Sequence, residues 1–124
     1  MGSSTLTAIE RLELELLVRD VLEALSLGLP DECVGLLHPH VIVRTRWTGE
    51  VRGREPAVRE CRLHLCPIQG SPILVSQITV SDSGVLAEYR VALPRGDGRP
   101  TPVTVRSLYT VEDFMIRGWQ QLEG

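Results

Sequence analysis

Two tyrosines, a serine and a histidine occupy positions from which they could do chemistry inside a folded chain. Tyr89, Ser107 and Tyr109 fall on the apolar face of alternating segments, so their hydroxyls are expected to point inward, where a ligand or water can bond them. His64 lies beside an apolar stripe and is the candidate general base. The structural alternatives are ordinary core packing of the tyrosines and a core-edge histidine bonded to a backbone carbonyl.

Two further candidates lie on the segment 41–47, VIVRTRW. Alternation places Val41, Val43, Thr45 and Trp47 on one face. Thr45 lies deep on this face and can donate a hydrogen bond, whereas Trp47 ends the face, where an aromatic ring can line or cap a cavity. The candidate ligand-binding residues are therefore Thr45, Trp47, Tyr89, Ser107 and Tyr109, with His64 as the candidate catalytic residue.

Metal and redox chemistry find little support in the sequence. His38 and His40 lie close together, but no third ligand of suitable spacing is near them. Cys33, Cys61 and Cys66 form an odd set without a CxxC pair, and each has apolar neighbours that suit a buried free thiol. We therefore expect neither a metal nor a cofactor.

Helices and strands must position these candidates. Apolar residues recur every three or four positions over 5–27, which is typical of a long packed helix that Ser4 or Thr5 can cap and Gly28 can end. Shorter helices are predicted over 31–37 and 55–65. Strands are predicted over 41–47, 73–80, 85–93, 103–112 and 115–122. This order predicts a single α+β domain over residues 1–124, with three N-terminal helices packed on a curved, mostly antiparallel sheet.

The other face of the predicted sheet mixes charged and apolar side chains. Its predicted members are Arg44, Arg46, Leu86, Glu88, Arg90, Arg106, Leu108, Glu112, Met115, Arg117 and Trp119. A solvated face with weak ion pairs is one interpretation. Mixed apolar, aromatic and arginine content favours the other, a homodimer interface through the outer face of the sheet.

Composition excludes several classes of partner. The 124 residues carry a net charge of −3, and all thirteen basic residues are arginine, which is typical of a GC-rich bacterial genome. Nucleic acids and acidic membranes are held by clustered positive charge, so neither is expected as a partner. The N-terminus lacks the pattern of a secretory signal, and no apolar run is long enough to span a membrane. We therefore expect a cytoplasmic protein.

The stretch VIVRTRWTGEVRGREPAVREC, together with the order of elements around it, resembles the nuclear transport factor 2-like superfamily. Its ketosteroid isomerase-like and SnoaL-like members are similar in pattern. The resemblance implies a cone that opens between sheet and helices. An isomerase of this type would place a tyrosine near Val21, a carboxylate base near Thr45 and a protonated acid near Ser107, and all three are missing. Their absence argues against proton abstraction next to a carbonyl. The Asp-Arg-Asp set of the related epoxide hydrolases is not evident either.

Three hypotheses about function follow. The first is a cone-fold protein that binds an apolar or aromatic small molecule between sheet and helices. The second is a SnoaL-like cyclase, isomerase or dehydratase that uses His64 with Tyr89, Tyr109 or Thr45, which requires these side chains to converge on one cavity. The third is a dimeric interaction module whose cone is filled by its own side chains.

Overall fold

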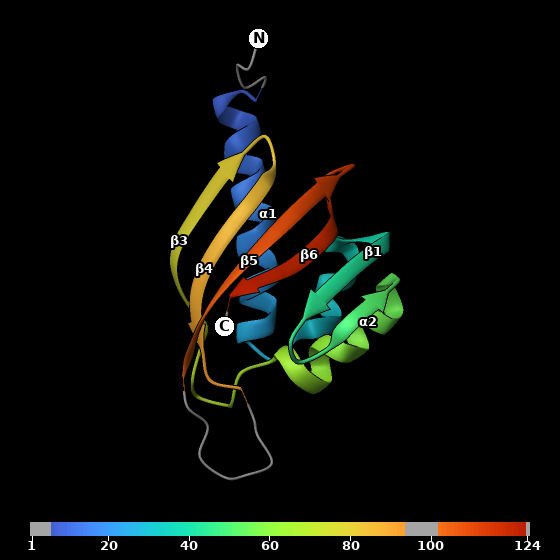
Figure 1. Ribbon diagram of the computed structural model, residues 1–124, viewed down its shortest axis with the longest axis vertical. Coiled ribbons are helices and arrows are strands. Elements are labelled where there is room, and N and C mark those ends of the chain that lie inside the picture. Colours follow the sequence, from blue (N-terminus) through green and yellow to red (C-terminus); the bar gives the residue numbers. More distant parts are fainter. Residues whose placement is uncertain (1–5, 94–101, 124) are drawn as a thin grey trace.

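The computed structural model describes residues 6–93 and 102–123, and it confirms the α+β architecture (Figure 1). Helical segments and strands follow one another along the chain. They are α1 (Ala8–Ser26), η1 (Pro30–Leu36), β1 (Leu37–Thr45), β2 (Gly49–Arg52), α2 (Arg54–Glu60), η2 (Cys61–Leu65), β3 (Leu74–Ser81), β4 (Gly84–Val91), β5 (Val103–Glu112) and β6 (Met115–Glu123). The described helices are each too short or too polar to cross a membrane.

The strands form one curved sheet in the order β2-β1-β6-β5-β4-β3. β1 and β6 pair in parallel, and the other neighbours pair antiparallel. In Figure 1, α1 runs behind β4 and β5, and α2 lies beside β1 and β2. The core fills the space between the helices and the inner face of the sheet. It includes Val21, Leu22 and Leu25 of α1.

α1 begins with a capping box at Thr7. The Thr7 hydroxyl accepts a hydrogen bond from the backbone N–H of Glu10 at 3.0 Å, and the Glu10 carboxylate accepts one from the Thr7 N–H at 3.3 Å. The predicted caps Ser4 and Thr5 lie outside the described residues. The helix ends as predicted at Gly28, whose φ of +72° favours glycine.

A bulge in β6 turns Trp119 inward. Thr110 pairs with Gly118 and Val111 with Ile116, so Arg117 is the extra residue between two ladder positions. The bulge shifts the alternation by one residue, and Trp119 consequently packs opposite Tyr109 with 1% of its surface exposed. The prediction that Trp119 belongs to the outer face is therefore wrong, because it assumed uninterrupted alternation along the strand.

Two local boundaries also differ from the sequence prediction. The residues after the first strand turn back at Gly49, whose φ is +66°, to form the short strand β2, which the alternation pattern did not show. The predicted third helix splits into α2 and the π-helical segment η2. Within η2, Cys61 is buried and His64 is exposed.

Candidate functional site

A cluster of polar side chains is buried on the inner face of β4, β5 and β6. Ser107 and Tyr109 are completely buried, and Tyr89 is 6% exposed. Trp119 joins them, with its ring centroid 5.3 Å from that of Tyr109. The structure thus brings together three of the predicted site residues and adds Trp119, which the sequence pattern had placed on the other face.

Polar atoms in this cluster lack partners. The hydroxyls of Tyr89, Ser107 and Tyr109 lie close enough to influence one another, but within the described part of the chain Ser107 Oγ, Tyr109 OH and Trp119 Nε1 have no partner at hydrogen-bonding geometry. Buried polar atoms in native proteins are nearly always bonded, so three orphans in one region mark a place where a ligand or an ordered water can bind. The two hydroxyls can donate or accept, whereas the indole nitrogen can only donate.

Burial also fixes the protonation state of the cluster. It raises the pKa of Tyr109 well above its ordinary value, and the neighbouring Tyr89 raises it further. Burial raises the pKa of Tyr89 too, although the nearby hydroxyls of Ser107 and Tyr109 partly oppose that effect. Both phenols therefore stay protonated at neutral pH, which makes them hydrogen-bond donors and not bases.

Thr45 and Trp47 lie at the turn between β1 and β2, where their side chains interact with residues of the turn itself. The Thr45 hydroxyl accepts hydrogen bonds from the backbone N–H groups of Trp47 at 3.2 Å and Thr48 at 3.1 Å, so it stabilises the turn. Trp47 is half-buried, and the guanidinium of Arg46 lies 5.5 Å from its ring centroid. Thr45 and Trp47 thus have structural contacts of their own.

His64 lies outside the core. Its side chain is 45% exposed, and its Nε2 atom is 4.0 Å from a carboxylate oxygen of Glu60 one helical turn earlier. The acid/base hypothesis requires His64 to meet the two tyrosines in one cavity, whereas Tyr109 is completely buried. The structure does not bring these side chains together.

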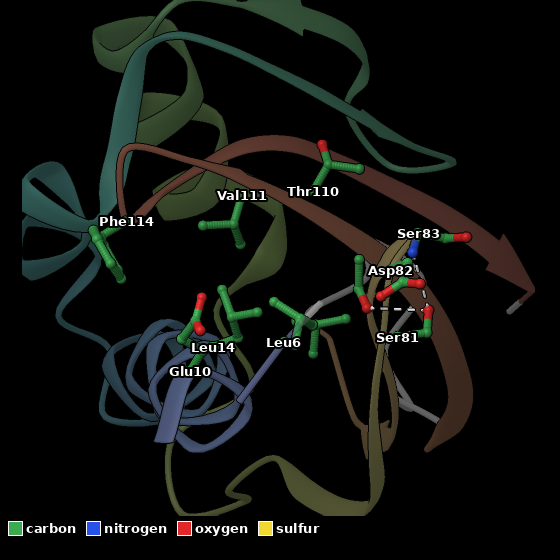
Figure 2. A pocket seen from close by; sticks show the side chains of 11 residues that line it. Leu6, Glu10, Leu14, Ser81, Asp82, Ser83, Thr110, Val111 and Phe114 are labelled. Carbon is green, nitrogen blue, oxygen red and sulfur yellow. Dashed lines mark hydrogen bonds between the residues drawn. The ribbon is translucent and has the colours of Figure 1, made fainter. Parts of the chain in front are cut away.

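A pocket of about 490 Å³ lies between the first half of α1 and one end of the sheet. Figure 2 shows Leu6, Glu10 and Leu14 on the helix side and the β3–β4 turn with Asp82 across the pocket. Its lining mixes apolar and polar side chains. The apolar lining residues are Leu6, Leu14, Val85, Val111 and Phe114, and the polar ones are Glu10, Ser81, Asp82, Ser83 and Thr110.

The pocket adjoins the buried polar cluster through the sheet register. Val85 lines the pocket and pairs with Tyr109, while Thr110 and Val111 follow Tyr109 directly in β5. The two features are therefore neighbours on the same part of the sheet. Tyr109 is not itself a lining residue of the pocket.

Sequence reasoning missed every residue that lines this pocket. Glu10 takes part in the capping box of α1, and Asp82 is a turn residue, so local roles account for both. Phe114 carried the one available signal, because a large aromatic residue is unusual in a tight turn. Asp113 and Phe114 both have positive φ, 54° and 57°, a conformation that costs a bulky residue free energy.

The described residues also bring a possible metal-ligand set together. His38, Glu112 and Asp113 offer ligand atoms within 4.8 Å of one another, the third ligand being supplied by the β5–β6 turn. However, His38 Nδ1 accepts a hydrogen bond from the His40 N–H at 3.0 Å, so its proton sits on Nε2 and faces Glu112 Oε2 at 3.2 Å. A metal-bound histidine normally donates its second N–H. The geometry fits a hydrogen-bonded clamp on the turn better than a metal centre.

Comparisons with solved structures agree on the fold. A protein named as a SnoaL-like polyketide cyclase, from Jannaschia sp. CCS1, has 14% sequence identity and a TM-score of 0.79, over 97% of this chain and 90% of that one. An epoxide hydrolase from Mycobacterium tuberculosis, described as LEH-like, has 22% identity and a TM-score of 0.74, over 90% and 83%. A de novo designed protein with a curved β-sheet has 19% identity and a TM-score of 0.73, over 90% and 84%.

The similar structures include an enzyme and a designed protein. The similarity therefore establishes the fold of this chain and not an activity. A comparison with curated protein sequences finds no match. The sequence profile of the SnoaL-like domain, in contrast, matches residues 18–119. Because that match spans most of the chain, the protein belongs to the SnoaL-like domain family of the nuclear transport factor 2-like superfamily.

Proposed function

We propose that this SnoaL-like protein binds a small apolar molecule in the pocket between α1 and the sheet. The observation that carries the proposal is the pocket itself. Its volume of about 490 Å³ lies in the range of small-molecule sites, and both walls contribute apolar side chains. Leu6 and Leu14 come from the helix, whereas Val85, Val111 and Phe114 come from the sheet and its turns.

The exposure of Phe114 supports this assignment. Its surface is 68% exposed, and its backbone is held at a positive φ in the turn between β5 and β6. An aromatic ring in that position adds little to the core. A bound apolar molecule would cover the ring and remove its surface from water. A cone filled by its own side chains, with no ligand, would leave both the pocket and this ring unexplained.

The experiment uses 1-octanol as the probe, with titration calorimetry and thermal unfolding as readouts. Octanol is expected to bind and to raise the melting temperature in a concentration-dependent way. Phe114→Ala and Leu14→Gln should each weaken binding about tenfold, since each removes apolar contact worth about 1.5 kcal/mol. Leu63→Gln is the matched control, because Leu63 is 61% exposed and lies outside the pocket.

The proposal fails if octanol does not bind, or if binding is insensitive to both pocket variants. Equal loss of affinity in Leu63→Gln would also overturn it, because the effect would then not come from the pocket.

Acid/base catalysis of the SnoaL type is a second candidate, favoured by the unpartnered donors Ser107, Tyr109 and Trp119. Such donors could stabilise an enolate oxygen, and the α-proton would pass to water, because the protonated phenols of the cluster are not bases. The test is exchange of the α-protons of 2-octanone in D₂O, followed by NMR. Acceleration that is lost in Tyr109→Phe would support catalysis, and exchange at the uncatalysed rate would exclude this chemistry for that ketone.

We also propose that the protein forms a homodimer through the outer face of the sheet. Leu86 and Leu108 are half-buried cross-strand neighbours there, with Gln120 next to Leu108 in the same row. Two nearby ion pairs, Arg44 with Glu50 and Arg106 with Glu123, add polar groups next to the apolar centre.

A further inference from the structure

The charge of the pocket between α1 and the sheet has one sign. Its two ionisable lining residues are Glu10 and Asp82, and the described residues that line it include no arginine or histidine. Its other polar lining groups are hydroxyls, from Ser81, Ser83 and Thr110. The polar part of the pocket therefore offers carboxylates and hydroxyl oxygens, all of which can accept hydrogen bonds.

The two carboxylates come from opposite walls. Glu10 projects from α1, whereas Asp82 lies in the turn between β3 and β4, as Figure 2 shows. Within the described part of the chain, neither takes part in an ion pair. One oxygen of Glu10 accepts the Thr7 N–H at 3.3 Å, which leaves its other oxygen available. A ligand between the walls would thus approach two negative charges.

A cation, Arg11, is held at the edge of the sheet beside the pocket. Arg11 follows Glu10 in α1, but its guanidinium donates to the backbone carbonyl of Val80 at 2.9 Å, and Arg11 is not a lining residue of the pocket. Arg11 therefore ties the helix to the edge strand β3. Its positive charge lies beside Ser81 at this wall and offsets part of the negative charge of Glu10 and Asp82.

The apolar and charged parts of the pocket select the same kind of ligand. A carboxylate-bearing molecule would meet like charges at Glu10 and Asp82, both of which are exposed, whereas an ammonium group would meet opposite charges and hydroxyl acceptors. The exposed ring of Phe114 adds a surface that attracts cations. A neutral apolar molecule would gain only from the walls.

We propose that the pocket takes a small molecule with an apolar body and a protonated amine, the amine lying between Glu10 and Asp82. This inference rests on the proposed function, because it names the ligand class of the same pocket. It adds a requirement for positive charge that apolar binding alone does not have.

The test compares three probes of equal chain length: octylammonium, 1-octanol and octanoate. Calorimetric titrations at pH 7 and low salt should give a dissociation constant for octylammonium about tenfold lower than that for octanol, with octanoate the weakest. Raising the salt concentration should weaken octylammonium binding and leave octanol binding unchanged.

Charge-removing variants locate the amine. Glu10→Gln and Asp82→Asn should each weaken octylammonium about three- to tenfold and leave octanol within about twofold. Both keep the local fold, since glutamine retains the capping box and asparagine suits the turn. Glu13→Gln, an exposed carboxylate on the same helix but outside the pocket, is the control for attraction by the net charge and should change neither affinity.

The outcomes separate the two proposals. Octanol binding with no preference for octylammonium, or an equal effect of Glu13→Gln, overturns the amine inference and leaves the apolar pocket standing. Failure of all three probes to bind overturns both. A preference for octylammonium that Glu10→Gln and Asp82→Asn both abolish supports the inference.

Discussion

Tyr109 and Trp119 lie opposite each other on β5 and β6, with ring centroids 5.3 Å apart and ring planes at 46°. Both are buried, yet the phenol oxygen and the indole nitrogen lack a hydrogen-bond partner among the described residues. The pair therefore combines favourable aromatic contact with the cost of two unpaired polar atoms. The free-energy cost of an unpaired atom can be measured with a variant that removes that atom alone.

Tyr109→Phe removes a hydroxyl that has no partner and keeps the ring. The free energy of unfolding is expected to stay the same or to rise by up to about 1 kcal/mol. Thr45→Val is the contrasting variant, because the Thr45 hydroxyl accepts the N–H groups of Trp47 and Thr48, and its loss should cost about 1–3 kcal/mol. Urea denaturation measures both. A loss above about 1 kcal/mol in Tyr109→Phe would show that the phenol has a partner, such as an ordered water.

Gly84→Ala should be strongly destabilising. Gly84 has a φ of +135°, and a Cβ there would lie 2.4 Å from the backbone carbonyl oxygen of Tyr109, which cannot move away without disturbing β5. We expect a loss of more than about 2 kcal/mol. Gly35→Ala is the control, since a Cβ at Gly35 meets nothing within 4 Å, and its effect should stay within about 0.5 kcal/mol. Equal melting temperatures for the two variants would contradict this account.

Phe114→Gly should separate stability from binding. Asp-Gly is the preferred pair for a turn with two positive φ values, so the variant relieves strain at the β5–β6 turn and is expected to stabilise the fold by about 1 kcal/mol. The same variant removes an aromatic ring from the pocket, and octanol affinity should fall about tenfold. Asp113→Gly relieves strain without removing a lining side chain, so it should stabilise the fold and keep the affinity. A loss of stability in both variants would contradict the strain argument.

The cysteines predict a loss of stability in alkali. Burial raises the pKa of the Cys33 thiol to about 12, and it raises the pKa of Cys61 still more strongly. In the unfolded chain these thiols ionise near pH 9. Between about pH 9 and 12 the unfolded state therefore binds fewer protons than the folded state, and the free energy of unfolding falls as the pH rises. Below about pH 8 the thiols contribute no pH dependence.

Denaturation under reducing conditions from pH 8 to 11 measures this slope, and Cys33→Ala should flatten it. In the native state a thiol reagent should modify Cys66, which is partly exposed, well before Cys33 and Cys61. Rapid modification of all three thiols would contradict the burial argument.

Sequence patterns predicted the frame of the fold because its signals are local. Apolar periodicity located α1, and alternation placed Tyr89, Ser107 and Tyr109 on the inner face, where they are buried. Trp119 was misplaced because a single bulged residue reverses every later side chain in a strand, and the one residue that signals the bulge, Gly118 beside Arg117, was not used.

The pocket was harder to predict because its lining residues come from segments that are far apart in the sequence. Glu10 and Asp82 are far apart in sequence, and each has a sufficient local reason to be where it is, as a cap and as a turn residue. His64 showed the opposite error. It lies next to an apolar stripe, but at the edge of that helix face, and its side chain is exposed.

The proposed dimer gives the final prediction. On the outer face, Leu108 lies between Leu86 and Gln120 and is half-buried in the single chain, so replacing it with a charged residue should leave the fold intact. In a dimer, the same charge would be buried without a partner. Leu108→Glu is therefore expected to convert the dimer to a monomer in sedimentation equilibrium experiments, with an unchanged circular dichroism spectrum. Leu63→Glu, a change of the same kind at an exposed leucine of η2, should remain dimeric. A native chain that is monomeric at high micromolar concentration would refute the interface.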